Sequence, residues 1–287
     1  LTHLGAGSVL TGLLVPVRAS RISDPGSAPT NGATPEDARK AAWDAIRAEK
    51  AAAAEKSEEN ITLLFAGDIM LDRGVEWAVH KFGQSDWKWP LILIADTLQQ
   101  ADLVFGNLES QISDKGTNVG SIYSFRAEPE SIETLLYSGF DVVSVDNNHS
   151  FDYTREALED SIARLKAAGI QVAPTVREVN GTTIAFLAYQ QWRMPEDYEE
   201  QIAVTKADIV VVSIHAGEEY APQPSEFQKT FAYKAIDAGA DLIIGHHPHV
   251  LQPLEQYEDG WIIYSLGNFL FDQAFSQETM QGAILKI

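Results

Sequence analysis

The sequence ITLLFAGDIML (residues 61–71) decides the fold, because an apolar run ends there in a glycine and an acidic side chain. Five more apolar runs end in polar loops, which read GNLE (106–109), DNNH (146–149), HAGEEY (215–220), GHHPH (245–249) and LGNF (266–269). Runs rich in Val and Ile that alternate with helical patterns are typical of an α/β fold with buried sheets. Because ligands bind beyond the carboxyl ends of strands in such sheets, we predict that the six loops meet at one edge.

The same patterns predict the order of strands and helices. We expect strands at residues 61–66, 103–105, 142–145, 171–173, 182–189, 209–214, 242–244, 250–256 and 261–265, and helices near 90–100, 129–138, 153–168, 199–207 and 224–239. Asn180-Gly181 is typical of a tight hairpin turn, which joins antiparallel strands. The sheets are therefore predicted to be mixed.

The polar loops carry side chains that bind divalent cations. Five of the seven histidines lie in them, beside Asp, Glu and Asn residues. Imidazole, carboxylate and amide oxygen suit borderline ions such as Mn²⁺, Fe²⁺ and Zn²⁺. Two such ions about 3.5–4 Å apart can hold a phosphate and activate a water, and a nearby His can protonate a leaving group. The chain has no cysteine, which excludes thiolate ligands, disulfides and a thiol nucleophile.

Acidic residues dominate the chain and argue against nucleic acid as a partner. The 21 Lys and Arg residues face 41 Asp and Glu residues, which gives a formal charge of −20. Residues 60–287 hold 14 of the basic and 33 of the acidic residues, so this region carries −19. Affinity for a phosphate backbone needs clustered Lys and Arg. The acidity indicates a solvated acidic surface, with some carboxylates available to bind cations.

The N-terminal part of the sequence is distinct from the rest. Residues 4–17 are uncharged, but these 14 residues are fewer than the roughly 20 that a membrane-spanning helix needs. We interpret residues 1–19 as the remnant of a signal peptide or of a membrane anchor, with a buried or frayed segment as the alternative. Residues 20–35 are predicted to be a linker, 36–58 a helical stalk and 60–287 the catalytic-type domain. Residues 282–287 are expected to form a strand without a closing turn, so we expect the natural chain to continue.

Six motifs along the chain resemble those of one protein family. They read GDIMLDRG (67–74), GNLES (106–110), DNNHSFDY (146–153), HAGEEY (215–220), GHHPHVLQPLE (245–255) and SLGNFLFDQ (265–273). In this order they resemble the CapA/PgsA family of capsule and poly-γ-glutamate synthesis proteins, a branch of the calcineurin-like metallophosphoesterases. The resemblance covers residues 61–287 and implies an αββα sandwich of two mixed β-sheets flanked by helices.

The resemblance also implies a metal site with one or two Mn, Fe or Zn ions. The residues that match the family's metal ligands are Asp68, Asn148, His215, His247 and His249, and His149 matches the catalytic histidine. Glu109 is the candidate for the bridging carboxylate, and Asn107 competes with it for that position.

Two positions depart from the usual metallophosphoesterase pattern. Met70 stands where the first motif usually has a His, and Asn107 where the second motif usually has an Asp. Both changes weaken one metal position, so a single ion is an open alternative to two.

Other residues of the motifs are candidates for contacts with substrate or with the ligands. Arg73 and Arg126 could bind carboxylate or phosphate groups. Glu218 and Glu219 could orient His215 from behind. Asn268 and Asp272 complete this set.

Three functions remain open for this sequence. The first is a metal-dependent hydrolase outside the cytoplasm, secreted or anchored through its N-terminus, that cleaves a phosphoester or an amide of poly-γ-glutamate. The second is a non-catalytic component that binds or exports an anionic polymer beside membrane-bound polymer synthase subunits. The third is a soluble cytosolic phosphatase.

Overall fold

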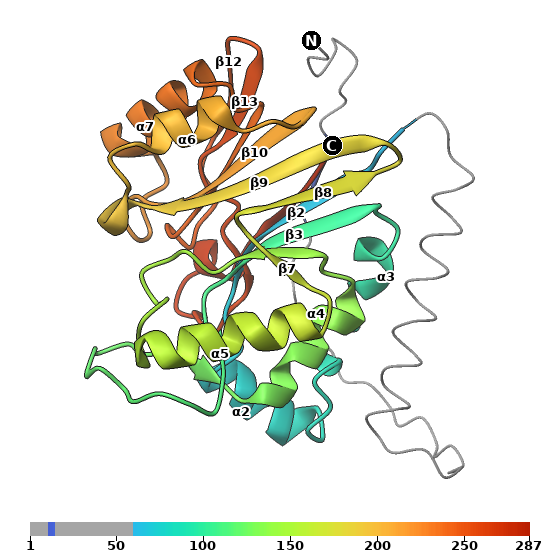
Figure 1. Cartoon of the computed structure of the whole chain (residues 1–287). Coiled ribbons are helices and arrows are strands. Elements are labelled where there is room, and N and C mark those ends of the chain that lie inside the picture. Colours follow the sequence, from blue (N-terminus) through green and yellow to red (C-terminus); the bar gives the residue numbers. More distant parts are fainter. Residues whose placement is uncertain (1–10, 15–59) are drawn as a thin grey trace.

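The computed structural model describes residues 11–14 and 60–287, which form two large β-sheets between helices (Figure 1). The first sheet consists, in spatial order, of β1 (Thr11–Leu14), β15 (Ala283–Lys286), β2 (Leu63–Ile69), β3 (Leu103–Leu108), β6 (Val142–Ser144) and β7 (Gln171–Val172), and β14 (Asn268–Leu270) pairs with β2. The second consists of β12 (Leu254–Tyr257), β13 (Gly260–Ile263), β11 (Leu242–His246), β10 (Ile209–His215), β9 (Thr182–Gln190) and β8 (Thr175–Val179). Strands β4 (Gln111–Ile112) and β5 (Arg126–Ala127) form a separate pair.

Helices cover the outer face of each sheet (Figure 1). Those beside the first sheet are α2 (Arg73–Phe82), α3 (Ala95–Leu98), α4 (Ile132–Ser138) and α5 (Thr154–Ala167). Those beside the second are α6 (Tyr198–Val204) and α7 (Glu226–Asp237). Short 3₁₀ helices are η1 (Trp89–Leu91), η2 (Pro129–Ser131), η3 (Gln191–Arg193) and η4 (Glu278–Met280). Among the described residues, no helix combines the length and the hydropathy needed to cross a bilayer.

The side chains of β2 alternate between two hydrophobic cores, as the two-residue period of a strand requires. Leu63 and Phe65 lie in the core between the sheets, whereas Leu64 and Ala66 lie in the core between the first sheet and its helices. A third core, which contains Val212, joins the second sheet to α6 and α7. Both sheets contain parallel and antiparallel pairs. The expected αββα sandwich of two mixed sheets is confirmed.

Several elements differ from the expectation. Strand β2 continues to Ile69 because β3 and β14 pair with its last residues. The strand expected at 250–256 is wrong for residues 250–253, where Pro253 has no N–H to donate and β12 begins only afterwards. The helix expected near 90–100 is shortened to α3, because Pro90 lies in the separate helix η1. The sequence did not predict α2.

The ends of the chain are described only in part. Strand β15 confirms the strand expected at 282–287, and it pairs antiparallel with both β1 and β2. Strand β1 lies inside the segment that we interpreted as a signal or anchor remnant. The predicted linker at 20–35 and helical stalk at 36–58 lie outside the described residues.

Candidate metal centre

Strand register brings three polar side chains together at one end of the first sheet. Asp68 on β2 is the register partner of Asn107 on β3 and of Asn268 on β14. All three are buried, and Nδ2 of Asn107 donates to Oδ1 of Asp68 over 2.8 Å. Gly67 permits the close packing here, since a Cβ atom at this position would lie 2.0 Å from the carbonyl oxygen of Gly267.

The second sheet brings four histidines to the same place. Strand β10 ends at His215 and β11 at His246, and these two residues are register partners. The loop after β11 carries His247 and His249, whose φ angles are 98° and 57°. Positive φ in such residues costs of the order of 1–3 kcal/mol and clusters at functional sites. All four imidazoles are buried beside the end of the first sheet.

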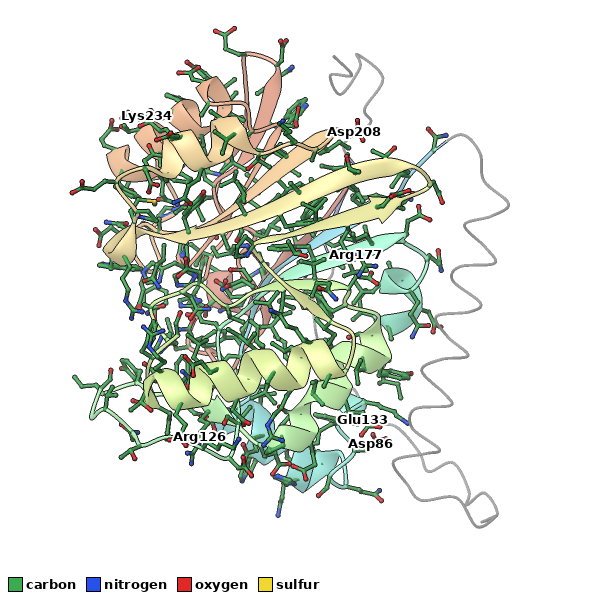
Figure 2. All side chains as sticks on the ribbon, viewed as in Figure 1. Asp86, Arg126, Glu133, Arg177, Asp208 and Lys234 are labelled. Atoms are coloured by element: carbon green, nitrogen blue, oxygen red, sulfur yellow. The ribbon has the colours of Figure 1, made fainter. Side chains whose placement is uncertain are left out.

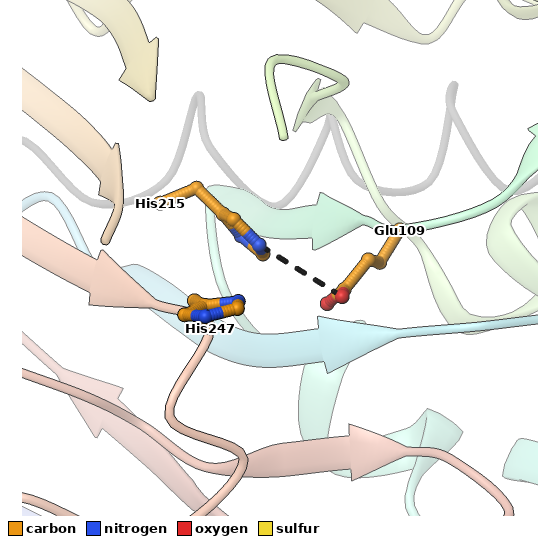
Figure 3. A group of neighbouring side chains, drawn as sticks. All are labelled: Glu109, His215 and His247. Atoms are coloured by element: carbon orange, nitrogen blue, oxygen red, sulfur yellow. Dashed lines mark ion pairs between the residues drawn. The ribbon is translucent and has the colours of Figure 1, made fainter. Parts of the chain in front are cut away.

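Glu109, directly after β3, lies among these histidines. It is 0% exposed, and neither carboxylate oxygen accepts a hydrogen bond from the described residues. Its Oε1 atom lies 3.6 Å from Nε2 of His249 and 3.8 Å from Nε2 of both His149 and His215. Figure 3 shows the side chains of Glu109, His215 and His247 converging, and these three offer ligand atoms within 4.8 Å of one another.

This donor set fits a divalent cation. A buried carboxylate without a partner costs several kcal/mol unless another charge compensates it. Ligand atoms that share one ion at about 2.0–2.2 Å lie roughly 3–4 Å from each other, which is the spacing around Glu109. Three overlapping groups could each hold an ion: Glu109, His215 and His247; Asp68, Glu109 and His249; and Glu219, His247 and His249. Glu109 belongs to two of them, as a bridging carboxylate would.

Burial and neighbouring charges together set the protonation of the site. Burial opposes the charge on His249, but Glu109 and Asp68 outweigh it and raise the pKa of His249 to about 9. Burial lowers the pKa of His247 to about 4 and the pKa of His215 well below its ordinary value, so these two imidazoles are neutral, the form that binds metals. Burial also raises the pKa of Glu109 well above its usual range. It opposes the charge on Asp68 as well, but the imidazoles of His246 and His249 outweigh it and hold the pKa of Asp68 well below its usual range. Of the two acids, Glu109 therefore gains more from a cation beside it.

His149 faces this centre and is held from behind by an acidic residue. Its Nδ1 atom lies 2.7 Å from Oδ2 of Asp152, and its Nε2 atom is the one directed toward Glu109. The ring of Phe125 stacks on the imidazole at 4.0 Å between centroids. Asp152 is buried and also accepts the backbone N–H of Phe125 over 2.8 Å. The orientation of His149 is therefore fixed on two sides.

The predicted amide residues contact the histidines and the carboxylates. Oδ1 of Asn148 lies 2.8 Å from Nε2 of His215, so these two predicted ligands are brought together. Asn107 donates to Asp68 and accepts from Asn147, which makes it a hydrogen-bonding neighbour of the site. This geometry favours Glu109 over Asn107 as the bridging residue. Asn268 contacts Nδ1 of His249 through Oδ1 over 2.9 Å.

The side chains of both predicted arginines are already engaged by other residues. Nε and Nη2 of Arg73 both donate to the carboxylate of Asp272, and its guanidinium lies 4.6 Å above the ring of Phe125. The Nη1 atom of Arg126 donates to the carbonyl oxygen of Lys115 over 2.9 Å. Its guanidinium lies 4.2 Å above the ring of Tyr153.

Two residues of the motifs take positions that the motifs did not indicate. Glu218 is exposed and makes no described side-chain contact with His215, whereas the neighbouring Glu219 belongs to one of the three ligand groups. Met70 is fully buried with Val75 in a small apolar cluster, and its sulfur accepts the N–H of Asp72. The thioether therefore packs against apolar side chains and a backbone N–H.

Sequence reasoning did not single out Asp152 or His246. Asp152 follows His149 by three residues, and this spacing inside DNNHSFDY was the available signal. His246 stands beside two predicted ligands, and its Nδ1 atom lies 3.3 Å from Oδ1 of Asp68. A run of adjacent histidines alone does not tell which of them reach an ion.

Sequence comparisons relate the chain to proteins of bacterial capsule synthesis. The family described as "Bacterial capsule synthesis protein PGA_cap" matches residues 62–273. Capsule biosynthesis protein CapA of Bacillus anthracis is 32% identical over 259 residues, which cover 77% of this chain and 62% of that protein. PGA biosynthesis protein CapA of Bacillus subtilis (strain 168) is 31% identical over 254 residues, which cover 77% and 66%. The chain thus spans 62–66% of the length of these curated relatives.

Solved structures show a weaker similarity. A hypothetical protein from Thermus thermophilus has a TM-score of 0.49 at 20% identity, with 72% of this chain and 76% of that one covered. A structure described as a novel phosphatase of Mycoplasma pneumoniae has a TM-score of 0.48 at 21% identity, with 73% and 72% covered. Both scores lie below 0.5, so the assignment rests on the sequence comparisons. Since the family match spans most of the described residues, the chain belongs to the PGA_cap family of bacterial capsule synthesis proteins.

Proposed function

We propose that this chain is a metal-dependent hydrolase of capsule or poly-γ-glutamate synthesis, acting on an anionic polymer or a phosphoester. The observation that carries the proposal is the environment of Glu109. Its buried carboxylate accepts no hydrogen bond from the described residues, yet three imidazole nitrogens approach Oε1 to within 3.6–3.8 Å. Such a carboxylate is satisfied when it shares a cation with those imidazoles.

The residues proposed to hold one or two Mn, Fe or Zn ions are Asp68, Glu109, Asn148, His215, His247 and His249. When bound, a divalent cation supplies charge neutralisation and Lewis-acid activation of water and of the scissile bond. Asn268 fixes the imidazole of His249 through Nδ1, which leaves Nε2 directed toward Glu109. The backbone N–H of His247 donates to Oδ2 of Asp68 over 3.1 Å and orients that carboxylate.

His149 is proposed to act as the general acid. Asp152 holds the Nδ1 proton of the ring, and Nε2 faces the centre. The carboxylate of Asp152 stabilises the doubly protonated ring, which can then give its Nε2 proton to a leaving group. Phe125 excludes water from one face of the imidazole.

Location outside the cytoplasm is part of the proposal. It is supported by the uncharged run at residues 4–17 and by the names of the Bacillus relatives, which refer to capsule and PGA biosynthesis. Fusion of the natural N-terminal segment to a reporter that is active only outside the cytoplasm tests it. An inactive reporter would contradict this location.

The hydrolase proposal is tested with the purified full chain. We expect divalent-dependent turnover of a generic phosphodiester or of poly-γ-glutamate, which is lost in Glu109→Gln. Glu130→Gln is the matched control, because Glu130 is exposed in the short helix η2, outside the ligand groups. If no divalent cation supports turnover of either substrate, the proposal is wrong.

A second function is supported by the position of Met70. Because its sulfur contacts the N–H of Asp72 within an apolar cluster, the usual histidine ligand of the first motif has no replacement there. This favours a non-catalytic, polymer-binding role beside the synthase subunits. A relative in Mycobacterium tuberculosis, 24% identical, is named a probable polyglutamine synthesis accessory protein. Capsule formation that survives His149→Ala but not deletion of residues 60–287 would establish this role.

A further inference from the structure

We propose that Arg193, stacked on Phe151, forms with Trp192 a subsite that binds carboxylates of a polymeric substrate beside His149. This inference rests on the proposed function and names the substrate class of the same site: a chain of carboxylates separated by methylene and amide groups.

The guanidinium of Arg193 has the geometry of an anion-binding group. Its central carbon lies 4.0 Å above the ring of Phe151, and that of Arg155 lies 5.7 Å from the same ring. A guanidinium placed over a ring can still donate its N–H groups to a carboxylate, and Arg193 already exerts its charge on the nearby carboxylate of Asp146. The edge of Arg73, by contrast, is already occupied by Asp272. Arg193 is exposed, so its edge can reach a substrate from solvent.

Helix η3, which carries Trp192 and Arg193, is anchored to the site at its start. Nε2 of Gln190 donates to Oδ1 of Asp146 over 2.9 Å and to the carbonyl oxygen of Asn147 over 2.7 Å. Oε1 of Gln191 accepts the N–H of Gly217 over 3.0 Å. These contacts connect η3 to the loop after β6, which carries His149, and to the loop after β10, which begins directly after His215. The subsite is therefore preorganised, which lowers the entropic cost of binding.

Trp192 supplies apolar surface beside the imidazoles of the centre. Its side chain is 50% exposed, and its ring lies 4.8 Å from the ring of His247 and 6.3 Å from that of His215. Because Trp192 contacts His247 and directly precedes Arg193 in η3, a substrate bound at both the centre and Arg193 can contact this indole. Polyglutamate offers methylene and amide groups for the indole and carboxylates for the guanidinium, whereas polyphosphate offers no apolar group. The pairing of Trp192 with Arg193 therefore favours a polycarboxylate.

The distribution of arginines supports the same conclusion. With a charge of −19, residues 60–287 repel a polyanion over most of their surface. Four of the six arginines in this region stack on aromatic residues of segments 123–125 and 151–153, on either side of His149; they are Arg73, Arg126, Arg155 and Arg193. Figure 2 shows Arg126 beside α5, well separated from Arg177 on β8. Most arginines of this region thus lie on aromatic rings of the segments that flank His149.

Equilibrium binding of a poly-γ-glutamate oligomer to the full chain tests the subsite. Arg193→Met keeps the aliphatic volume and removes the charge, and we expect it to raise the Kd about tenfold, the loss typical of one charge-assisted pair. Arg177→Met is the matched control: Arg177 is the register partner of Ile184, near the opposite end of β9 from η3, and its Kd should equal that of the wild type. An unchanged Kd in Arg193→Met would overturn the proposal.

A polyphosphate of equal length tests the substrate class. We expect it to bind more weakly than poly-γ-glutamate, and we expect Trp192→Ala to weaken only poly-γ-glutamate. If polyphosphate binds as tightly as poly-γ-glutamate, and Trp192→Ala changes the Kd of neither ligand, the assignment of a polycarboxylate substrate is wrong. Failure of the hydrolase proposal can be distinguished from failure of the subsite proposal. If only the hydrolase proposal fails, the wild-type protein shows no turnover but still binds poly-γ-glutamate in a way that depends on Arg193.

Discussion

The Oε1 atom of Glu109 lies 3.6 Å from Nε2 of His249, although neither oxygen of this fully buried carboxylate accepts a hydrogen bond from the described residues. The separation is too long for a hydrogen bond and matches two ligands of one ion. Asp68 completes a ligand group with the same two residues. The stability and the chemistry of the centre should therefore both depend on a divalent cation.

Removal of divalent cations with EDTA is expected to lower the Tm of the wild-type protein. A cation present at 100 times its Kd adds about 2.7 kcal/mol to the free energy of unfolding. In Glu109→Gln the buried charge is absent, so EDTA should change the Tm little, and the metal-free variant should melt above the metal-free wild type. Thermal unfolding of both proteins with and without EDTA measures this. A wild-type Tm that does not respond to EDTA would contradict the prediction.

His149→Ala is expected to lower kcat by about 10²–10⁴-fold, the usual contribution of a general acid. Metal content should stay at the wild-type level, since His149 lies in none of the ligand groups. Steady-state kinetics and metal analysis of the same preparation check both parts. Loss of metal in parallel with loss of turnover would instead identify His149 as a ligand.

Asp152→Asn should lower kcat by about 10–100-fold while leaving KM close to the wild-type value. The amide oxygen can still accept the N–H of Phe125, so the loop is retained, but the charge that stabilises protonated His149 is lost. The separate measurement of kcat and KM distinguishes this positioning role from a structural one. A rise in KM with unchanged kcat would refute it.

The strand ends of the first sheet were predictable only in part. The apolar run before Gly67 predicts β2, because both faces of the strand are buried. Its continuation through Asp68 and Ile69 depends on pairing with β3 and β14, and β14 lies about two hundred residues away in the sequence. Such long-range pairing leaves no local pattern.

The candidate ligands could be predicted from the sequence because they follow strands, and the ends of the strands meet at one edge of the sheets. The contacts of Asp152 with His149 and of Trp192 with His247 depend instead on side-chain direction and on the placement of η3. Loop conformations such as the positive φ of His247 are fixed by tertiary contacts. The sequence therefore predicts the composition of the site better than its geometry.

From the ion pairs of Asp160 on α5 we expect a loss of stability at acidic pH. Burial alone would raise its pKa, but bonds from Lys115, Arg164 and Ser113 outweigh it and lower the pKa below the ordinary 3.8. A carboxylate whose pKa is lower in the folded than in the unfolded state stabilises the fold at pH values above its unfolded-state pKa. This contribution is lost as the pH falls below about 4.

Asp160→Asn should therefore lower the free energy of unfolding by about 1 kcal/mol at pH 7, and the difference should shrink in acid. Glu159→Gln is the control, because among the residues that the structure describes Glu159 pairs with exposed Arg155 alone, at 3.8 Å. Urea unfolding from pH 7 to pH 3 measures both variants. Equal effects of the two substitutions at pH 7 would contradict the prediction.

Metal analysis of the full chain, purified without chelators, tests the central claim most directly. We predict one or two equivalents of Mn, Fe or Zn in the wild type and in Glu130→Gln, and a loss of at least one equivalent in Glu109→Gln. Wild-type protein that carries no divalent metal and binds none on titration, or Glu109→Gln that retains the full wild-type content, would contradict the account.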